Sequence, residues 1–162
     1  MKLKKVSWIP VIIVMVIIFA FSSKPADSSN ESSMTVADHI LSAYENTTQV
    51  QFDTEQRYQV LETINNFVRK GSHFCEYALL AVTLAFHFYI HGFTGMRLLL
   101  LSIAVSATYA ATDEFHQTFI PGRSGQFRDV MIDTSGAAAG MLFFFILLSI
   151  YNSLRNRKRR LN

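Results

Sequence analysis

The sequence predicts an all-α integral membrane protein with about four transmembrane helices and an extracytoplasmic amphipathic helical segment. Half of the 162 residues are apolar, only 17% are charged, and the mean hydropathy is +0.23. Apolar runs of about 20 residues cross a bilayer as helices, because every backbone polar group is then paired within the segment. Basic residues gather at both ends of the chain, as is typical of cytoplasmic anchors.

Four apolar runs account for the predicted spans. The first, at residues 6–21, makes residues 1–21 an N-terminal transmembrane anchor; a cleaved signal peptide is the alternative that we favour less. The other three form a membrane core over residues 69–151, with spans at 74–90, 96–111 and 130–151. In the last of these, Gly136 and Gly140 have the small-xxx-small spacing that lets two helices approach closely.

Residues 22–68 form an acidic polar segment, which suits a loop translocated to the extracytoplasmic side. We predict two amphipathic helices within it. The second begins near Asp53, where Asp53 and Gln56 have the spacing of a capping box. The first carries an apolar face made of Val36, Ile40, Leu41 and Tyr44.

The basic residues predict the topology. Eight of the fifteen lysines and arginines lie in the two terminal tails, the second of which covers residues 152–162: Lys2, Lys4, Lys5, Arg155, Arg157, Lys158, Arg159 and Arg160. The positive-inside rule then places both termini in the cytoplasm and the chain in the cell membrane as a multi-pass protein. We expect no nucleic-acid partner, because no folded part of the chain carries a basic face.

Three polar clusters fall at one membrane face under this topology. At the entrance to the second span, Arg69, His73 and Glu76 share a helix face at i, i+4 and i+7. At the exit of the third span, Asp113, His116 and Gln117 share a face, and Glu114 is expected to point to one side. Charged groups at membrane depth are costly, so they usually face a bundle interior and indicate function.

The third cluster opens the last span. It combines the turn at residues 121–125 with Arg128, Asp129 and Asp133. The candidate ligand-binding residues of the three clusters are Arg69, Lys70, His73, Glu76, Asp113, Glu114, Gln117, Arg123, Arg128, Asp129 and Asp133. We expect no metal and no cofactor, because the spacing of these residues matches no known ligand set.

The segments RKGSHFCEYALLA and DEFHQTFIPGRSGQFRDVMIDTSGAAAG, with the earlier FSSKP, resemble the VanZ family of bacterial membrane proteins. The resemblance implies a multi-span protein of Gram-positive bacteria that acts in the cell envelope. The founding member of the family is tied to low-level resistance to the glycopeptide teicoplanin. The positions that match the family pattern are Arg69, Lys70, His73, Glu76, Tyr77, Asp113, Glu114, Gln117, Arg123, Asp129, Asp133 and Gly136.

Three functions are compatible with these residues. The leading one is binding of a phosphate-bearing lipid or lipid-linked cell-wall precursor, with an effect on teicoplanin susceptibility, because arginine binds phosphate bidentately. The second is a membrane enzyme acting on a lipid-linked phosphate, with Glu114 as the candidate catalytic base and Arg123 as the phosphate clamp. The third is a structural network in which the three arginines, Arg69, Arg123 and Arg128, pair with the carboxylates.

Overall fold

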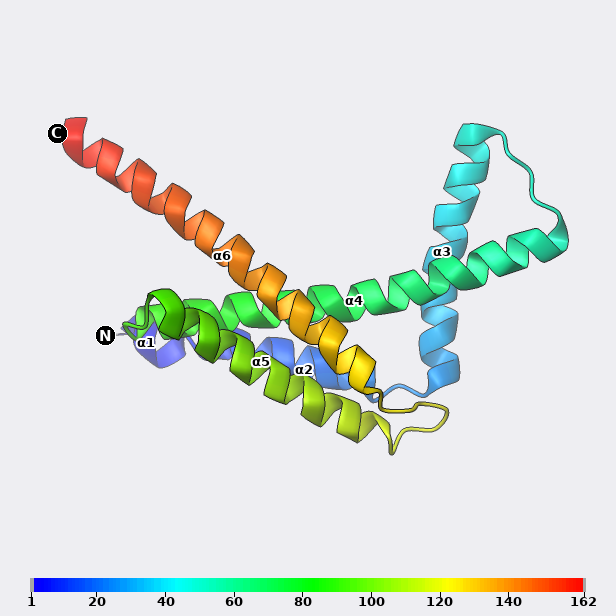
Figure 1. The fold of residues 1–162 in the computed structure, drawn as a ribbon, viewed down its shortest axis with the longest axis horizontal. Coiled ribbons are helices and arrows are strands. Elements are labelled where there is room, and N and C mark those ends of the chain that lie inside the picture. The colour runs from blue at the N-terminus through cyan, green and yellow to red at the C-terminus, as the bar shows by residue number, and fades with distance from the viewer. Residues whose placement is uncertain (1, 162) are drawn as a thin grey trace.

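The computed structural model describes residues 2–161, and the side chains of residues 4–159, so the side chains of Lys2 and Arg160 lie outside it. Within this range the chain is helical, without a strand (Figure 1). Six helices follow one another along the chain: α1 (Lys2–Val6), α2 (Ile9–Ser22), α3 (Ala26–Thr48), α4 (Thr54–Ile90), α5 (Gly95–Gln117) and α6 (Phe127–Leu161).

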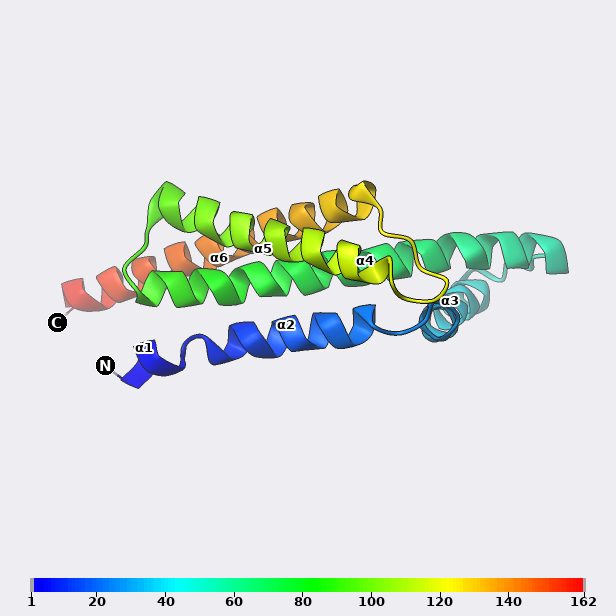
Figure 2. The ribbon, with the colours of Figure 1, turned by 90° about the horizontal axis from the view of Figure 1, so that it is seen from below.

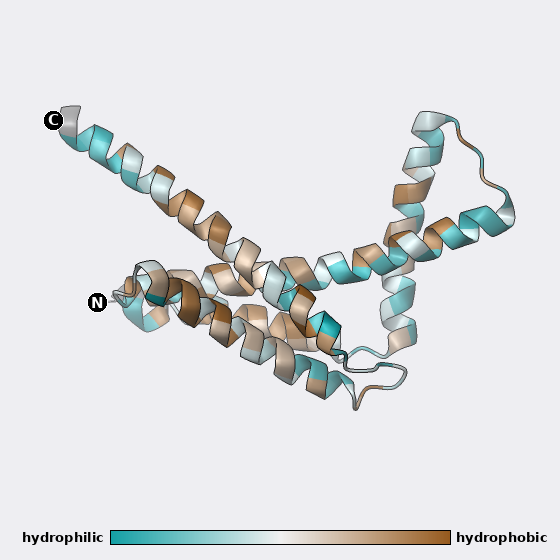
Figure 3. Ribbon diagram, viewed as in Figure 1, coloured by the Kyte–Doolittle hydropathy of each residue, from teal (hydrophilic) through white to brown (hydrophobic). Residues whose placement is uncertain are grey.

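Four segments of the described chain are long and apolar enough to cross a membrane: Lys4–Ser22, Thr54–Ile90, Gly95–Gln117 and Phe127–Arg159. Apolar residues cover their outward faces, and large side chains such as Ile13, Val16 and Leu142 are more than half exposed. Figure 3 shows the same pattern, with hydrophilic residues gathered on the beginning of α4 and the end of α6. The predicted all-α membrane fold is confirmed.

Helices α2, α4, α5 and α6 lie side by side in one bundle, and α1 and the end of α6 lie at the same end of it (Figure 2). The opposite end, where α2 and α5 finish and α6 begins, is called the site end below. Two buried clusters hold the bundle together. One joins α2, α4 and α5 through residues such as Ile18, Leu80 and Ala110, and the other joins α4, α5 and α6 through residues such as Ala81, Leu98 and Met141.

Helices α4 and α6 make the closest approach. A Cβ atom added to Gly136 would clash with the carbonyl oxygen of Phe74, and one added to Gly140 would clash with that of Ala78. The predicted close contact at these glycines is therefore present. It fixes a register in which α4 and α6 run in the same direction away from the site end.

The beginning of α4 differs from the expected arrangement. The amphipathic helix starting at Asp53 and the span expected at residues 74–90 are one helix of 37 residues, and its capping box is formed as predicted. No proline interrupts the polar stretch before the span, and Gly71 costs a helix only about 1 kcal/mol. The division expected between residues 68 and 69 stays a prediction, although α4 crosses it without a break.

A helix of this length extends about 55 Å, against roughly 30 Å for the hydrocarbon core of a bilayer. The polar half of α4 therefore projects beyond the bundle at the site end. Helix α3 runs across this projection (Figures 1 and 2), and Arg57 ties the two together through Asp38 at 2.9 Å and Glu45 at 3.2 Å. Only part of the expected apolar face of α3 is buried: Leu41 is buried, whereas Val36, Ile40 and Tyr44 remain exposed.

Candidate functional site

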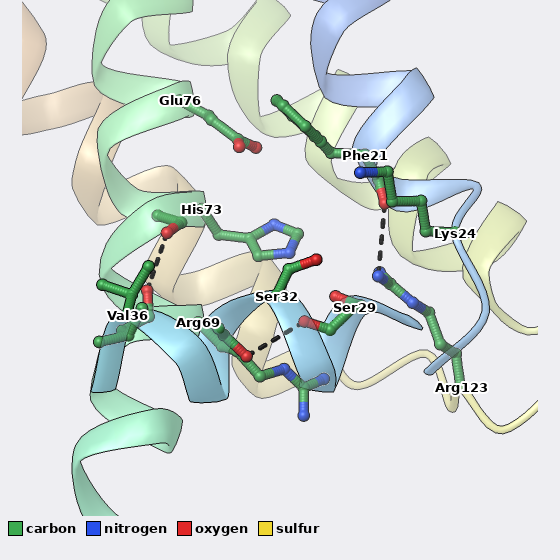
Figure 4. A pocket seen from close by; sticks show the side chains of 12 residues that line it. Phe21, Lys24, Ser29, Ser32, Val36, Arg69, His73, Glu76 and Arg123 are labelled. Carbon is green, nitrogen blue, oxygen red and sulfur yellow. Dashed lines mark hydrogen bonds between the residues drawn. The ribbon is translucent and has the colours of Figure 1, made fainter. Parts of the chain in front are cut away.

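A cleft of about 310 Å³ opens at the site end between α2, α3, α4 and the loop before α6; we call it the arginine pocket. Three of its side chains are basic and one is acidic, so positive charge prevails. In Figure 4, Glu76, His73 and Arg69 follow one another along α4, and Arg123 faces them from the loop. The lining residues are Phe21, Lys24, Ser29, Ser32, Ser33, Val36, Val68, Arg69, Ser72, His73, Glu76 and Arg123.

Arg123 is held in place by two neutral acceptors. Its Nη1 donates to Gln117 Oε1 at 3.2 Å and its Nη2 donates to the carbonyl oxygen of Phe21 at 3.3 Å. Its Nε is buried and has no hydrogen-bond partner within the described chain. Burial lowers the pKa of Arg123, and the neighbouring charge of Arg69 lowers it further. Three nearby carboxylates oppose this shift, and an anion bound in the pocket would stabilise the charged guanidinium further.

The loop that carries Arg123 is fitted closely to the helices around it. The backbone N–H of Ala26, at the start of α3, donates to Pro121 O at 3.1 Å. Gly122 has a φ of +74°, and a Cβ atom there would lie 2.9 Å from the Cβ of Ala26. A side chain at this position would meet both backbone strain and a clash. The glycines of the PGRSG turn thus set the approach of Arg123 to the pocket.

A second cleft of about 230 Å³ adjoins the first; we call it the carboxylate pocket. Arg69 and His73 line both clefts, so the two clefts are neighbours that meet at these side chains. Carboxylates predominate among the charged residues of the second cleft. Its lining residues are Asn66, Arg69, Lys70, His73, Glu114, Gln117, Gln126, Asp129, Ile132 and Asp133.

The end of α5 differs from the sequence expectation at Glu114. Instead of pointing to one side, Glu114 is as buried as Asp113 and Gln117, with exposed fractions of 5%, 3% and 6%. Residues at i, i+1 and i+4 lie on one helical face, and this face points into the bundle. His116, expected on that face, is only half-buried and lies against Phe19, with ring centroids 4.7 Å apart.

Hydrogen bonds join these three side chains. Gln117 Nε2 donates to Asp113 Oδ2 at 3.1 Å and to Glu114 Oε1 at 3.2 Å, while its own Oε1 accepts from Arg123. The second oxygen of Glu114 accepts from the backbone N–H of Gln126 at 2.9 Å. Both oxygens of the candidate base are thus engaged, and Glu114 fastens the loop to α5. A catalytic role for it stays a prediction.

The arginine–carboxylate pairs expected for a structural network are not formed. Within the described chain, none of Arg69, Arg123 and Arg128 has a carboxylate inside the 4.0 Å limit of a salt bridge. The closest pairs at the site are instead Lys70–Asp129 and His73–Asp133, each at 3.9 Å, and the second is an ion pair only where His73 is protonated. Arg123 donates its hydrogen bonds to the side-chain amide of Gln117 and the backbone carbonyl of Phe21. Arg128 is exposed and lines neither pocket. The predicted pairing of these three arginines with carboxylates is therefore wrong.

The family model for VanZ/LLP1 matches residues 7–148, which is most of the chain and includes every side chain of the two pockets. The chain belongs to the VanZ/LLP1 family. This confirms the resemblance drawn from the two sequence motifs. The chain has no significant match among curated proteins or among solved structures.

Polar residues of the two VanZ motifs lie together around the two pockets, as expected from the sequence. Of the eleven candidate residues, all but Asp113 and Arg128 line one of the two pockets. No three His, Cys, Asp or Glu side chains of the described residues are grouped so that they could hold a metal ion.

Sequence reasoning missed the contribution of α3 to this VanZ site. Ser29, Ser32 and Val36 line the arginine pocket, although they lie outside both main motifs. Their spacing of i, i+3 and i+7 is a helical face, so the pattern was present in the sequence. Nothing in the sequence, however, tells that this face turns toward α4 and the PGRSG loop.

Replacing Ser22 with alanine tests how the VanZ site is attached to the first span. Ser22 Oγ donates to Asp113 Oδ2 at 2.7 Å, and both residues are buried. Losing this bond leaves the carboxylate one donor short, so we expect the free energy of unfolding to fall by about 1–3 kcal/mol. Thermal unfolding in mild detergent measures the change.

The matched control is Ser23→Ala. The Ser23 hydroxyl donates only within its own helix, to Phe19 O at 2.7 Å, so its removal is expected to change the unfolding temperature little. Equal losses in the two variants would contradict a specific role for the Ser22–Asp113 contact.

Proposed function

We propose that this protein binds the phosphate of a lipid or lipid-linked cell-wall precursor in the arginine pocket, at the outer face of the cytoplasmic membrane. The observation that carries the proposal is the pair of arginines, Arg69 and Arg123, that face one cleft without a carboxylate partner within the described chain. Guanidinium groups offer several donors in a planar fork that matches phosphate oxygens.

The arginine pocket also has apolar side chains in its lining, which suits the acyl chains of a lipid. Phe21, Val36 and Val68 line it beside the basic residues. Phe21 and Val36 are half exposed, at 50% and 48%. An amphiphile could thus place its phosphate against the arginines and the start of its chains against these apolar side chains. A soluble anion would gain nothing from this apolar wall.

The level of the pocket in the bundle favours a headgroup as well. Arg69 lies on α4 where the polar projection meets the apolar span, and Glu76 lies two turns further into the bundle. The orientation that we infer keeps the basic terminal tails in the cytoplasm, by the positive-inside rule. The site end then faces the outer leaflet, where glycopeptides act on cell-wall precursors. An effect on teicoplanin susceptibility would follow from binding at this face.

The Arg123→Lys variant tests the proposal. Lysine keeps the charge and loses the planar fork, so we expect roughly tenfold less retention of phosphatidylglycerol in native mass spectra of the detergent-solubilised protein. Diacylglycerol, which has the same chains without a phosphate, measures retention by the apolar wall alone. The same variant is expected to abolish any change in teicoplanin susceptibility that the wild-type protein confers.

Arg128→Lys is the matched control, because Arg128 is exposed and lines neither pocket. It is expected to retain phosphatidylglycerol like the wild type. Equal retention by the wild type, Arg123→Lys and Arg128→Lys proteins would argue against phosphate binding at Arg123.

A further inference from the structure

Basic side chains outnumber acidic ones in the arginine pocket, which also contains Glu76, and carboxylates outnumber basic side chains in the carboxylate pocket, which also contains Lys70. The two pockets share Arg69 and His73 as lining residues. On one side of Arg69 and His73 lie the basic side chains Lys24 and Arg123. On the other side lie three carboxylates, those of Glu114, Asp129 and Asp133. One ligand lying across Arg69 and His73 would therefore meet cations with one part and carboxylates with another.

The three carboxylates of the carboxylate pocket are satisfied to different degrees. Both oxygens of Glu114 accept hydrogen bonds from Gln117 and Gln126. Asp129 is about one-third exposed, and its Oδ1 lies 3.9 Å from Lys70 Nζ. Asp133 is completely buried, and neither of its oxygens has a hydrogen-bond partner within the described chain.

Asp133 lines the carboxylate pocket, and both of its carboxylate oxygens are unused acceptors buried at the wall of that pocket. His73 Nδ1 lies 3.9 Å from its Oδ1, which is too far for a hydrogen bond, and that nitrogen is itself without a partner. A buried carboxylate without donors costs free energy, and a positively charged donor entering the pocket would offset that cost. A cationic donor beside Asp133 would therefore stabilise the ionised form of this carboxylate.

The kind of cation follows from the arrangement of the acidic groups. A bound metal ion needs several ligands at short distance, and the described residues contain no such group of His, Cys, Asp or Glu. A primary ammonium needs only a few acceptors, since it carries three donors on one atom. Asp133 and the partly exposed Asp129 can supply acceptors of this kind.

We propose that the carboxylate pocket binds a primary ammonium group on the same lipid whose phosphate occupies the arginine pocket. The preferred ligand is then a zwitterionic aminophospholipid, with its phosphate at Arg69 and Arg123 and its ammonium at Asp133. The inference rests on the proposed function, because a phosphate bound in the arginine pocket would bring the ammonium of the same lipid to the carboxylate pocket. It adds a selectivity that the arginine pocket alone would not have.

The test compares phosphatidylethanolamine, phosphatidylglycerol and diacylglycerol with the same acyl chains, offered in equal amounts to the full chain in mild detergent. Native mass spectrometry measures the retained lipid. We expect the wild-type protein to retain phosphatidylethanolamine about tenfold over phosphatidylglycerol. Asp133→Asn keeps the shape of the side chain and removes its charge, so the preference for phosphatidylethanolamine is expected to disappear.

Two further variants complete the design. Asp129→Asn, at the more exposed end of the pocket, is expected to reduce the preference for phosphatidylethanolamine over phosphatidylglycerol. This variant tests the ammonium site if Asp133→Asn does not fold. Glu55→Gln removes an acidic charge from the exposed first turn of α4, away from both pockets, and is expected to keep the preference.

The outcomes separate the two proposals. If both phospholipids exceed diacylglycerol and phosphatidylethanolamine is not preferred, the ammonium site is overturned while phosphate binding stands. If neither phospholipid exceeds diacylglycerol, both proposals fall. A preference that survives in the folded Asp133→Asn protein, or in Asp129→Asn where the former does not fold, also overturns the ammonium site.

Discussion

Replacing Gly136 with alanine is expected to push α6 away from α4 and to lower the free energy of unfolding by about 3 kcal/mol. The added methyl group would clash with the carbonyl oxygen of Phe74, and backbone atoms of a helix cannot move aside as a side chain can. Gly140 makes the same close contact with Ala78 one turn further along. A shift of α6 at Gly136 would therefore disturb the contact at Gly140 as well. Thermal unfolding in detergent measures the loss.

Gly71→Ala is the matched control for this prediction. Gly71 lies within α4, and a Cβ atom there would meet open space. Alanine stabilises a helix by up to about 1 kcal/mol relative to glycine, so this variant is expected to unfold at an equal or higher temperature. The two substitutions are chemically identical and have opposite expected signs. A change of the same sign in both variants would show that the α4–α6 contact is not what Gly136 provides.

Replacing Gly125 with alanine is expected to abolish lipid retention while leaving the bundle folded. A Cβ atom at Gly125 would clash with the carbonyl oxygen of Glu114 and lie 2.8 Å from Thr118 Cγ2, so the loop would have to leave the end of α5. Arg123, two residues earlier, would lose its contacts with Gln117 and Phe21. We expect at least the roughly tenfold fall in retained phosphatidylglycerol predicted for Arg123→Lys.

The control is Ser124→Ala, in the same loop. Ser124 is exposed, and its hydroxyl accepts only a 3.3 Å contact from Gln126 Nε2. This variant is expected to retain lipid like the wild type. A Gly125→Ala protein that binds phosphatidylglycerol normally would mean that the position of Arg123 does not depend on the fit between the loop and α5.

Both glycine predictions depend on backbone contacts between segments distant in the chain, and this is where sequence reasoning was incomplete. The spacing of Gly136 and Gly140 predicted a close helix approach but named no partner helix. Glu114 was expected to point aside, because the direction of the buried face of α5 depends on which helices surround it. The pairing of Arg69 and Arg123 with carboxylates was wrong because charge complementarity in the sequence does not specify distances in space.

The sequence by itself determined the membrane fold, the four apolar spans, the capping box at Asp53 and the family. These features depend on local composition and on periodicity, which act over a few residues at a time. Only the tertiary structure decided that α4 continues through Gly71, that α3 lines the arginine pocket and that Asp133 is buried without a hydrogen-bond partner in the described chain. Each of these depends on packing between helices, where the position of one backbone limits which polar groups on another can meet.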